Sequence, residues 1–342
     1  MSRSTIHIET PRKQRYFLRI LALVTSLIAI VFIILALLSF RKANDVTSIT
    51  SKPLANFSAN VMPDYQNITF RSLDESIQLK GWFFPTKTQV VGTLVVIHSY
   101  GQNRLPFDSN HAKLFERVIE EGYQIIAFDL RASGESSGER QTFGYNEWED
   151  VVAAMQYSYQ LSGVDKFVLY GIGSGVTAGL RAYERIPTVD TDLEALAQGS
   201  LVEQRLAELS FDQTSVKGFI LDSALVHGDD YISYEIRRED ERFASILAET
   251  VPLAVRMSSG LADNLFVVGS LSRINAPILL IHQATIDGIP EADISSVLSE
   301  RQRLFPNRTY VFESRSKVFL GAYDLDDTGY RNACIDYLKI LK

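Results

Sequence analysis

Cysteine is almost absent from the sequence, and histidine is absent from its C-terminal part. The 342 residues contain one cysteine, Cys334, and five histidines, of which His282 is the last. A single cysteine excludes an internal disulfide and any cysteine-rich metal site. Ligand spacings typical of zinc, calcium or a P-loop do not occur, and neither does an internal repeat. We therefore expect no metal and no other cofactor.

Positive charge is scarce outside the N-terminus. Residues 1–42 carry seven basic residues and one acidic residue, a sum of +6, whereas the other 300 residues sum to −13. Because phosphate recognition needs a basic face, this acidic body argues against nucleic acid as a partner.

A long hydrophobic run is present near the N-terminus. Ile20–Leu38 has nineteen residues without a charge. As a helix it would span about 28 Å, close to the hydrocarbon thickness of a bilayer. A core helix of this length would show a polar face, and a cleaved signal peptide would have a shorter run and a small-x-small site. The run ends instead in SFRK, which favours an uncleaved membrane anchor over residues 17–40.

The charges around the hydrophobic run predict its orientation. Five basic residues precede the run, and two follow it closely. The positive-inside rule then places residues 1–16 in the cytoplasm and the C-terminal domain across the membrane, in the periplasm or outside the cell in a bacterium. Residues 41–64 are polar and contain two prolines, so we predict a linker there. The globular domain is expected over residues 65–342.

Short apolar runs alternate with helical patterns in the body of the chain. Residues 65–72 and 76–85 predict a hairpin. Buried strands are predicted at 92–98, 123–129, 166–171, 216–222, 277–282 and 308–313, and helices at 111–121, 145–161, 175–185, 291–304 and 329–341. This alternation indicates a mostly parallel sheet with helices on both faces. Two stretches interrupt it: an acidic insertion at 187–215 and a cap-like insertion at 225–272.

Five sequence blocks carry a family resemblance. They are VIHSYGQNR (96–104), FDLRASGESSGERQTFGYNEWEDVVAAMQY (128–157), LYGIGSG (169–175), ILDSA (220–224) and PILLIHQATIDGIP (277–290). In order and spacing the chain resembles the α/β-hydrolase superfamily, above all the membrane-anchored or secreted hydrolases related to the S33 serine aminopeptidase and Bem46-like group. The resemblance covers about residues 65–342. It implies the α/β-hydrolase fold with a helical cap, and an oxyanion loop formed by His98, Ser99, Tyr100 and Gly101.

The same resemblance shows that all three catalytic positions have changed. A serine hydrolase needs a nucleophile, a histidine base and an acid. The elbow motif G-x-S-x-G places Gly173 at the nucleophile position, and the acid loop places Ile286 at the acid position. The histidine position falls on Phe319, or on Tyr323 in another register. We therefore predict a pseudohydrolase that binds either a small acyl-type ligand in the former catalytic pocket or a protein through the acidic insertions.

The alternative hypothesis is an active ester or amide hydrolase with a rearranged site. Ser174 and Asp287 each follow a triad position by one residue, and His227 follows the strand after the elbow strand. Their structural roles would be a hydroxyl in the first helical turn, an Asp-Gly turn and an exposed loop histidine. A nucleotide-binding interpretation of the glycine-rich turn fails, because the dinucleotide fingerprint requires a glycine at Val176.

Overall fold

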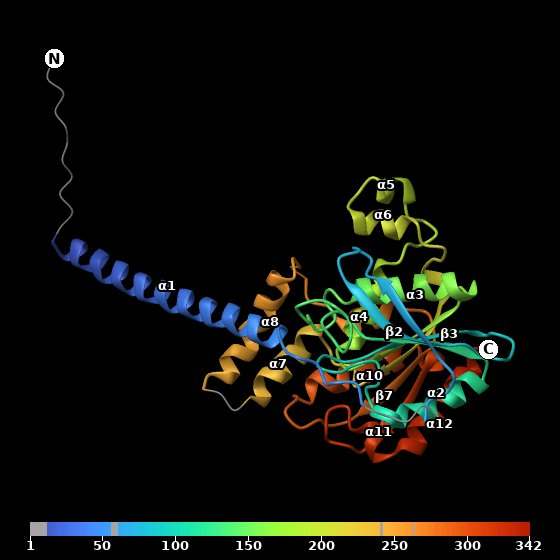
Figure 1. The fold of residues 1–342 in the computed structure, drawn as a ribbon. Coiled ribbons are helices and arrows are strands. Elements are labelled where there is room, and N and C mark those ends of the chain that lie inside the picture. Colours follow the sequence, from blue (N-terminus) through green and yellow to red (C-terminus); the bar gives the residue numbers. More distant parts are fainter. Residues whose placement is uncertain (1–11, 56–60, 240–241, 262) are drawn as a thin grey trace.

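The computed structural model describes residues 12–55, 61–239, 242–261 and 263–342, and an eight-stranded sheet organises these residues (Figure 1). The strands are β1 (Gln66–Arg71), β2 (Gln78–Phe84), β3 (Gly92–Ile97), β4 (Tyr123–Phe128), β5 (Phe167–Ile172), β6 (Val216–Asp222), β7 (Ile278–Gln283) and β8 (Thr309–Ser314). Their spatial order is β1-β2-β4-β3-β5-β6-β7-β8. β2 is antiparallel to both of its neighbours, and every pairing from β4 to β8 is parallel. The predicted hairpin and the mostly parallel sheet are confirmed.

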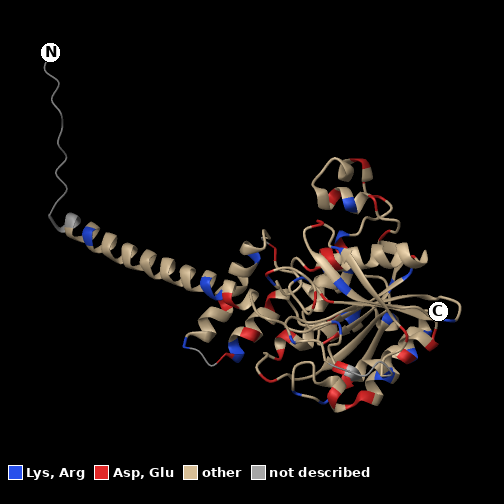
Figure 2. Cartoon of the chain, viewed as in Figure 1, with Lys and Arg blue, Asp and Glu red and all other residues tan. Residues whose placement is uncertain are grey.

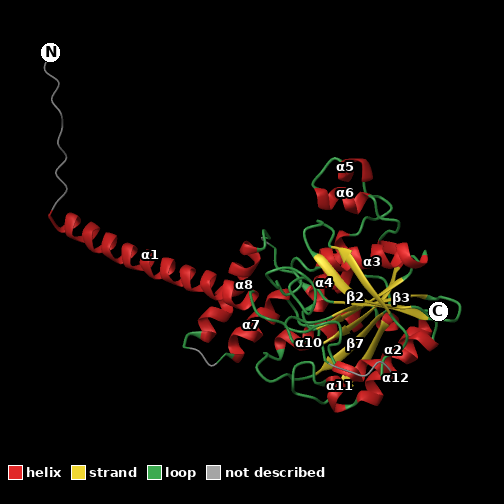
Figure 3. Ribbon diagram, in the orientation of Figure 1, coloured by secondary structure: helices red, strands yellow, loops and turns green. Residues whose placement is uncertain are grey.

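Helices cover both faces of the sheet, as Figure 3 shows. One face carries α3 (Trp148–Ser162), α4 (Gly175–Arg185), α9 (Val267–Arg273) and α10 (Ala292–Leu304), and the other carries α2 (His111–Glu120), α11 (Ala322–Leu325) and α12 (Asp327–Ile340). β3, β4 and β5 are buried along their whole length, which explains their unbroken apolar sequences. The sheet therefore lies between two hydrophobic cores.

The two predicted insertions are helical. Residues 187–215 contain the short helices α5 (Leu193–Ala197) and α6 (Leu201–Ala207). The cap contains α7 (Gly228–Arg238) and α8 (Ala244–Ser258), which form a third apolar cluster with the end of α1. In Figure 1 this cap lies beside α1, whereas α5 and α6 lie at a distance from it.

The first helix is longer than the predicted anchor. α1 runs from Arg12 to Thr47, and among the described residues it is the helix long and apolar enough to cross a membrane. Figure 2 shows its central turns without charged residues. The predicted linker over 41–64 is thus helical as far as Thr47, where Val46 is buried against the cap. Most of the predicted tail over 1–16, namely residues 1–11, lies outside the described residues.

Candidate functional site

The turn between β5 and α4 has the geometry of a nucleophile elbow with glycine at its apex. Gly173 has φ +54°, in the left-handed region that glycine adopts without strain. Gly175 opens α4 so close to β3 that a Cβ there would lie 2.2 Å from the Ile97 carbonyl oxygen. Strand, turn and helix are therefore packed as tightly as an elbow requires, but the apex offers no side chain.

The space that a side chain on Gly173 would enter is bounded by Ser99 and Phe319. A Cβ built on Gly173 would lie 2.4 Å from Ser99 Oγ and 3.3 Å from Phe319 Cζ. The Phe319 ring packs against Tyr234 of the cap, with 4.8 Å between the ring centroids. The phenyl ring of Phe319 therefore lies beside the apex. A serine hydrolase needs a proton acceptor at this place, and a phenyl ring cannot accept a proton. Of the two residues that the sequence offers for the histidine position, Phe319 lies beside the apex, and the Tyr323 hydroxyl donates to the Asn110 carbonyl oxygen.

The backbone N–H groups that form an oxyanion hole are hydrogen-bonded within the chain. In this fold they come from the residue after the nucleophile and from the loop after β3. Here the Ser174 N–H donates to Ser99 Oγ at 3.3 Å, and the Tyr100 N–H donates to Ser174 Oγ at 2.8 Å. The Gly101 N–H donates to the Gln141 side-chain oxygen at 2.8 Å. A substrate oxyanion would have to displace these bonds.

Two buried groups hold the oxyanion loop on β4. The His98 Nδ1–H donates to the Ser99 carbonyl, and its Nε2 accepts from the Leu130 N–H, so both ring nitrogens are used. Burial lowers the His98 pKa, which keeps the ring neutral. Arg104 forms a buried ion pair with Asp129 at 2.5 Å. These contacts make His98 a structural member of the loop.

Ser174 and His227 have different partners. The Ser174 side chain is buried and its oxygen accepts the Tyr100 N–H, whereas the His227 side chain is 40% exposed. The His227 ring stacks on Phe266, with centroids 5.2 Å apart, and its Nδ1 lies 3.6 Å from Asp230 Oδ2. The hydrogen bonds of the described residues do not join the Ser174 hydroxyl to His227.

In the acid loop after β7, the carboxylate of Asp287 is exposed to solvent. Ile286, at the predicted acid position, is buried in the apolar cluster of the cap. Asp287 is exposed, and its N–H donates to the Lys317 carbonyl oxygen at 2.8 Å. Asp287 thus fixes a turn through its backbone while its side chain faces solvent.

Gln283 is a residue whose role the sequence interpretation missed. It is buried, and its amide nitrogen donates to the carbonyl oxygens of Ser316 and Val318, both at 2.8 Å. Its oxygen accepts from the Ser223 hydroxyl at 3.0 Å. Gln283 therefore anchors the segment that leads into Phe319. The available signal was a long polar side chain directly after a buried strand.

Asp222, at the end of β6, is a buried acid that the sequence interpretation did not single out. Its carboxylate accepts from the Tyr330 hydroxyl at 2.7 Å and from the Ser223 hydroxyl at 2.9 Å. The Tyr170 hydroxyl lies 2.5 Å from that of Tyr330. Burial raises the Asp222 pKa to about 6, although the two hydroxyl donors lower it. Its hydrogen-bonding partners here are hydroxyl groups.

A cleft of about 650 Å³ is lined by Ser99 and Phe319, the two residues next to Gly173, and is bordered by the cap. Its walls come from the oxyanion loop (Ser99, Tyr100, Gly101), from the segment after β8 (Val318, Phe319, Leu320) and from α7 (Tyr234, Glu235, Arg238). Arg238 lies over the Tyr234 ring and pairs with Glu235 at 3.1 Å. The cleft thus combines aromatic walls with paired charges at its rim.

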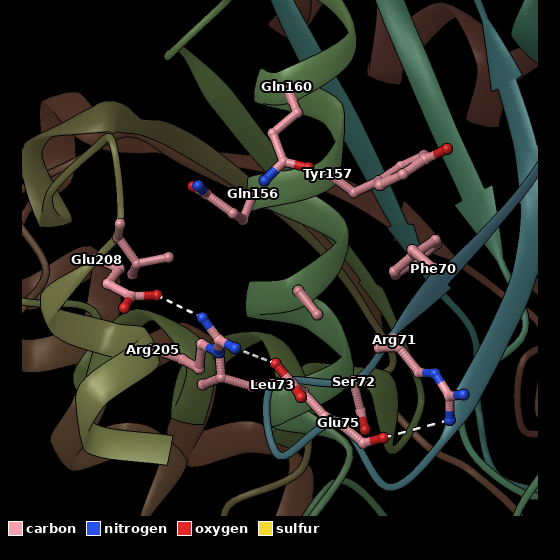
Figure 4. A pocket seen from close by; sticks show the side chains of 12 residues that line it. Phe70, Arg71, Ser72, Leu73, Glu75, Gln156, Tyr157, Gln160, Arg205 and Glu208 are labelled. Carbon is pink, nitrogen blue, oxygen red and sulfur yellow. Dashed lines mark hydrogen bonds and ion pairs between the residues drawn. The ribbon is translucent and has the colours of Figure 1, made fainter. Parts of the chain in front are cut away.

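A second hollow, of about 320 Å³, lies between β1, α3 and α6 (Figure 4). Arg205 projects from α6 and forms ion pairs with Glu208 and Glu75. Arg71 donates to the Glu75 carbonyl oxygen. These contacts attach the acidic insertion to the β1–β2 turn. Among the described residues, no cluster of three or more His, Cys, Asp or Glu side chains could hold a metal.

Similarities to known proteins fit this architecture. Residues 81–158 match the family model of the X-Pro dipeptidyl-peptidase (S15 family). This segment runs from β2 into α3 and ends before the elbow. The match is thus independent of the residues at the three triad positions. No curated protein matches the chain.

Solved structures resemble the whole domain. An esterase of Pyrococcus furiosus, Pf2001, superposes with a TM-score of 0.59 at 14% identity, over 86% of this chain and 98% of the esterase. A DcsB complex with its substrate analogue superposes with a TM-score of 0.51 at 13% identity, over 81% of this chain and 98% of DcsB. With the strand order given above, these likenesses define an α/β-hydrolase fold.

Proposed function

We propose that this chain is a membrane-anchored α/β-hydrolase-fold protein that has lost Ser-His-Asp chemistry and binds a small acyl-type ligand. The cleft beside Gly173 is the proposed site. Tyr100, Tyr234 and Phe319 give the cleft aromatic surface for an acyl chain, and polar side chains such as Lys52 and Asp108 line the rest of it. The closer relation to the S33 and Bem46-like hydrolases is part of this proposal, and the order of the five sequence blocks supports it.

The observation that carries the proposal is the contact between Gly173 and Phe319. Nucleophile and base must lie within hydrogen-bond reach for acyl transfer. Here the apex lacks an oxygen, and Phe319 Cζ would lie 3.3 Å from a Cβ on Gly173. The engaged N–H groups of Tyr100 and Ser174 support the same conclusion, because preorganised free donors are usually a large part of such catalysis.

Chemical labelling of the full-length protein in detergent tests the loss of hydrolysis. A fluorophosphonate probe and a short-chain p-nitrophenyl ester are expected to give neither labelling nor turnover. Gly173→Ser combined with Ser99→Gly, which makes room for the new side chain, should also stay unlabelled. Adding Phe319→His should give labelling, because the base matters more than the acid in such triads. Wild-type labelling that vanishes in Ser174→Ala would show an activated Ser174 and overturn the proposal.

Binding of a dansylated fatty acid tests the ligand. Val318 lines the cleft and is 67% exposed, so Val318→Trp should narrow the cleft without disturbing the core. Val189→Trp, on the distant acidic insertion and 77% exposed, is the matched control. We expect weaker binding in the first variant only. Equal binding by both variants would remove the cleft as the site, and no binding by wild type would favour a protein partner.

A further inference from the structure

The outer side of the cap helix α8 is uncharged and exposed. Ile246, Leu253 and Met257 are 50%, 49% and 56% exposed, and Thr250 lies among them. Positions spaced by four, three and four residues share one face of a helix. This stripe (Ile246, Thr250, Leu253, Met257) is a mostly apolar surface that is only partly covered.

Two charged residues near the stripe form ion pairs with residues on or at the end of α7. Glu249 pairs with Arg237 of α7 at 2.9 Å. Lys42, just beyond the apolar part of α1, pairs with Glu239 at the end of α7. Glu249 follows Ile246 by three residues and precedes Leu253 by four, so it borders the stripe on α8, and its carboxylate contacts Arg237 of α7.

The stripe lies against the predicted anchor. Ser39 Oγ of α1 and Thr250 Oγ1 are 2.7 Å apart. Next to this contact, the two helices enclose a groove of about 250 Å³ lined by apolar side chains. Phe32 and Leu35 form its wall on α1, and Leu253 and Met257 form its wall on α8. Figure 1 shows α8 alongside the last turns of α1.

The position of this groove along α1 gives its depth in the proposed membrane, measured from the end of the uncharged run. Phe32 precedes Leu38, the last residue of the uncharged run, by six residues. At 1.5 Å per residue, the groove begins about 9 Å inside the end of that run. Helices that lie in a membrane interface bury their apolar faces by about 5–10 Å. Leu253 and Met257, the stripe residues that line the groove together with Phe32, therefore lie at the depth of such an interfacial helix.

We propose that α8 lies in the interface of the bilayer that α1 crosses, and that the groove between them holds an acyl chain of a membrane lipid. The inference rests on the proposed membrane anchoring and concerns a site separate from the cleft. The bilayer is favoured as the occupant because the groove continues the uncharged surface of α1. A second copy of the chain is the competing occupant.

Fluorescence quenching in liposomes tests this inference on the full-length protein. Single cysteines at Leu253, Val31 and Leu193 carry a bimane label, and the lipids carry bromine on their acyl chains. Val31 is 57% exposed on α1, and Leu193, 47% exposed on the distant α5, is the control for water. Native Cys334 is buried, so the wild-type protein measures background labelling.

We expect several-fold stronger quenching at Leu253 than at Leu193, because an interfacial helix contacts acyl chains. Quenching at Val31 but not at Leu253 would overturn the inference and leave the anchor intact. If Leu253 is unquenched with blue-shifted emission, a second copy covers the stripe and the inference is wrong. If Val31 is unquenched, the membrane anchoring itself fails, and the inference fails with it.

Discussion

The Ser174 hydroxyl stabilises the backbone of the oxyanion loop by a hydrogen bond. Its oxygen accepts the Tyr100 N–H at 2.8 Å in a buried place. Removing the acceptor leaves that N–H without a partner, which costs about 1–3 kcal/mol. We expect Ser174→Ala to lower the unfolding free energy by this amount, measured by denaturant titration in detergent.

A matched control separates this effect from a general serine effect. Ser295 is exposed on α10, so Ser295→Ala should leave the unfolding free energy nearly unchanged. If both variants are equally stable, the Ser174–Tyr100 bond does not contribute to stability, and the structural role assigned to Ser174 is wrong.

The raised pKa of Asp222 predicts that the folded protein becomes less stable as the pH rises from 4 to 6. Burial raises its pKa in the folded protein to about 6, above its ordinary value of 3.8. The folded state therefore binds the proton more tightly, and the Asp222 contribution to stability falls as pH rises from 4 to 6. The difference amounts to at most about 3 kcal/mol. Relative to Asp222→Asn, wild type should lose stability across this window, as thermal unfolding at pH 4, 5 and 6 would show. A constant difference would contradict the raised pKa.

Single residues at the site could be predicted from the sequence only where a motif fixes their position. Gly173 and Ile286 follow by counting from neighbouring motif residues within one short block. Gln283 and Asp222 could not be found this way, because their partners Val318 and Tyr330 lie far along the chain. The bonds from the Ser174 N–H to Ser99 Oγ and from the Tyr100 N–H to Ser174 Oγ likewise depend on how closely β3 and α4 pack.

The segment between β8 and α11 depends on one side chain of a neighbouring strand. Gln283 bonds the carbonyl oxygens of Ser316 and Val318. We expect Gln283→Ala to speed amide hydrogen exchange in residues 316–321, because local opening loses two hydrogen bonds. Gln160→Ala, at an exposed position of α3, should leave this segment unchanged. Equal exchange in both variants would show that other contacts hold the segment.

Elements with strong local patterns were predicted well. α4 has the predicted bounds, 175–185, since a glycine turn and an apolar periodicity mark both its ends. The end of α1 was less predictable. The sequence after Leu38 is polar, and its helix continues to Thr47 because Ala43 and Val46 pack against the distant cap. Tertiary packing of this kind leaves little local signal.

The arrangement of the whole molecule in a cell is the least determined by its fold. The five basic residues before the uncharged run predict an extracytoplasmic domain. A cysteine in place of Val189, on the exposed acidic insertion, should react with a membrane-impermeant maleimide in intact cells, while buried Cys334 in wild type should not. Reaction only after the cells are lysed would show that the domain is cytoplasmic.

The continuous helix α1 also limits how the cleft can meet its ligand. The cleft is lined by Ile49 and Lys52, which follow the last turn of α1 almost directly. Val46, in the last turn of the helix, packs against the cap, so α1 and the cap are joined close to the cleft. If α1 crosses a membrane as proposed, this packing holds the entrance of the cleft at a fixed height above the lipid headgroups. A molecule that diffuses along the membrane surface searches for it in two dimensions, and its rate of capture depends on its surface density.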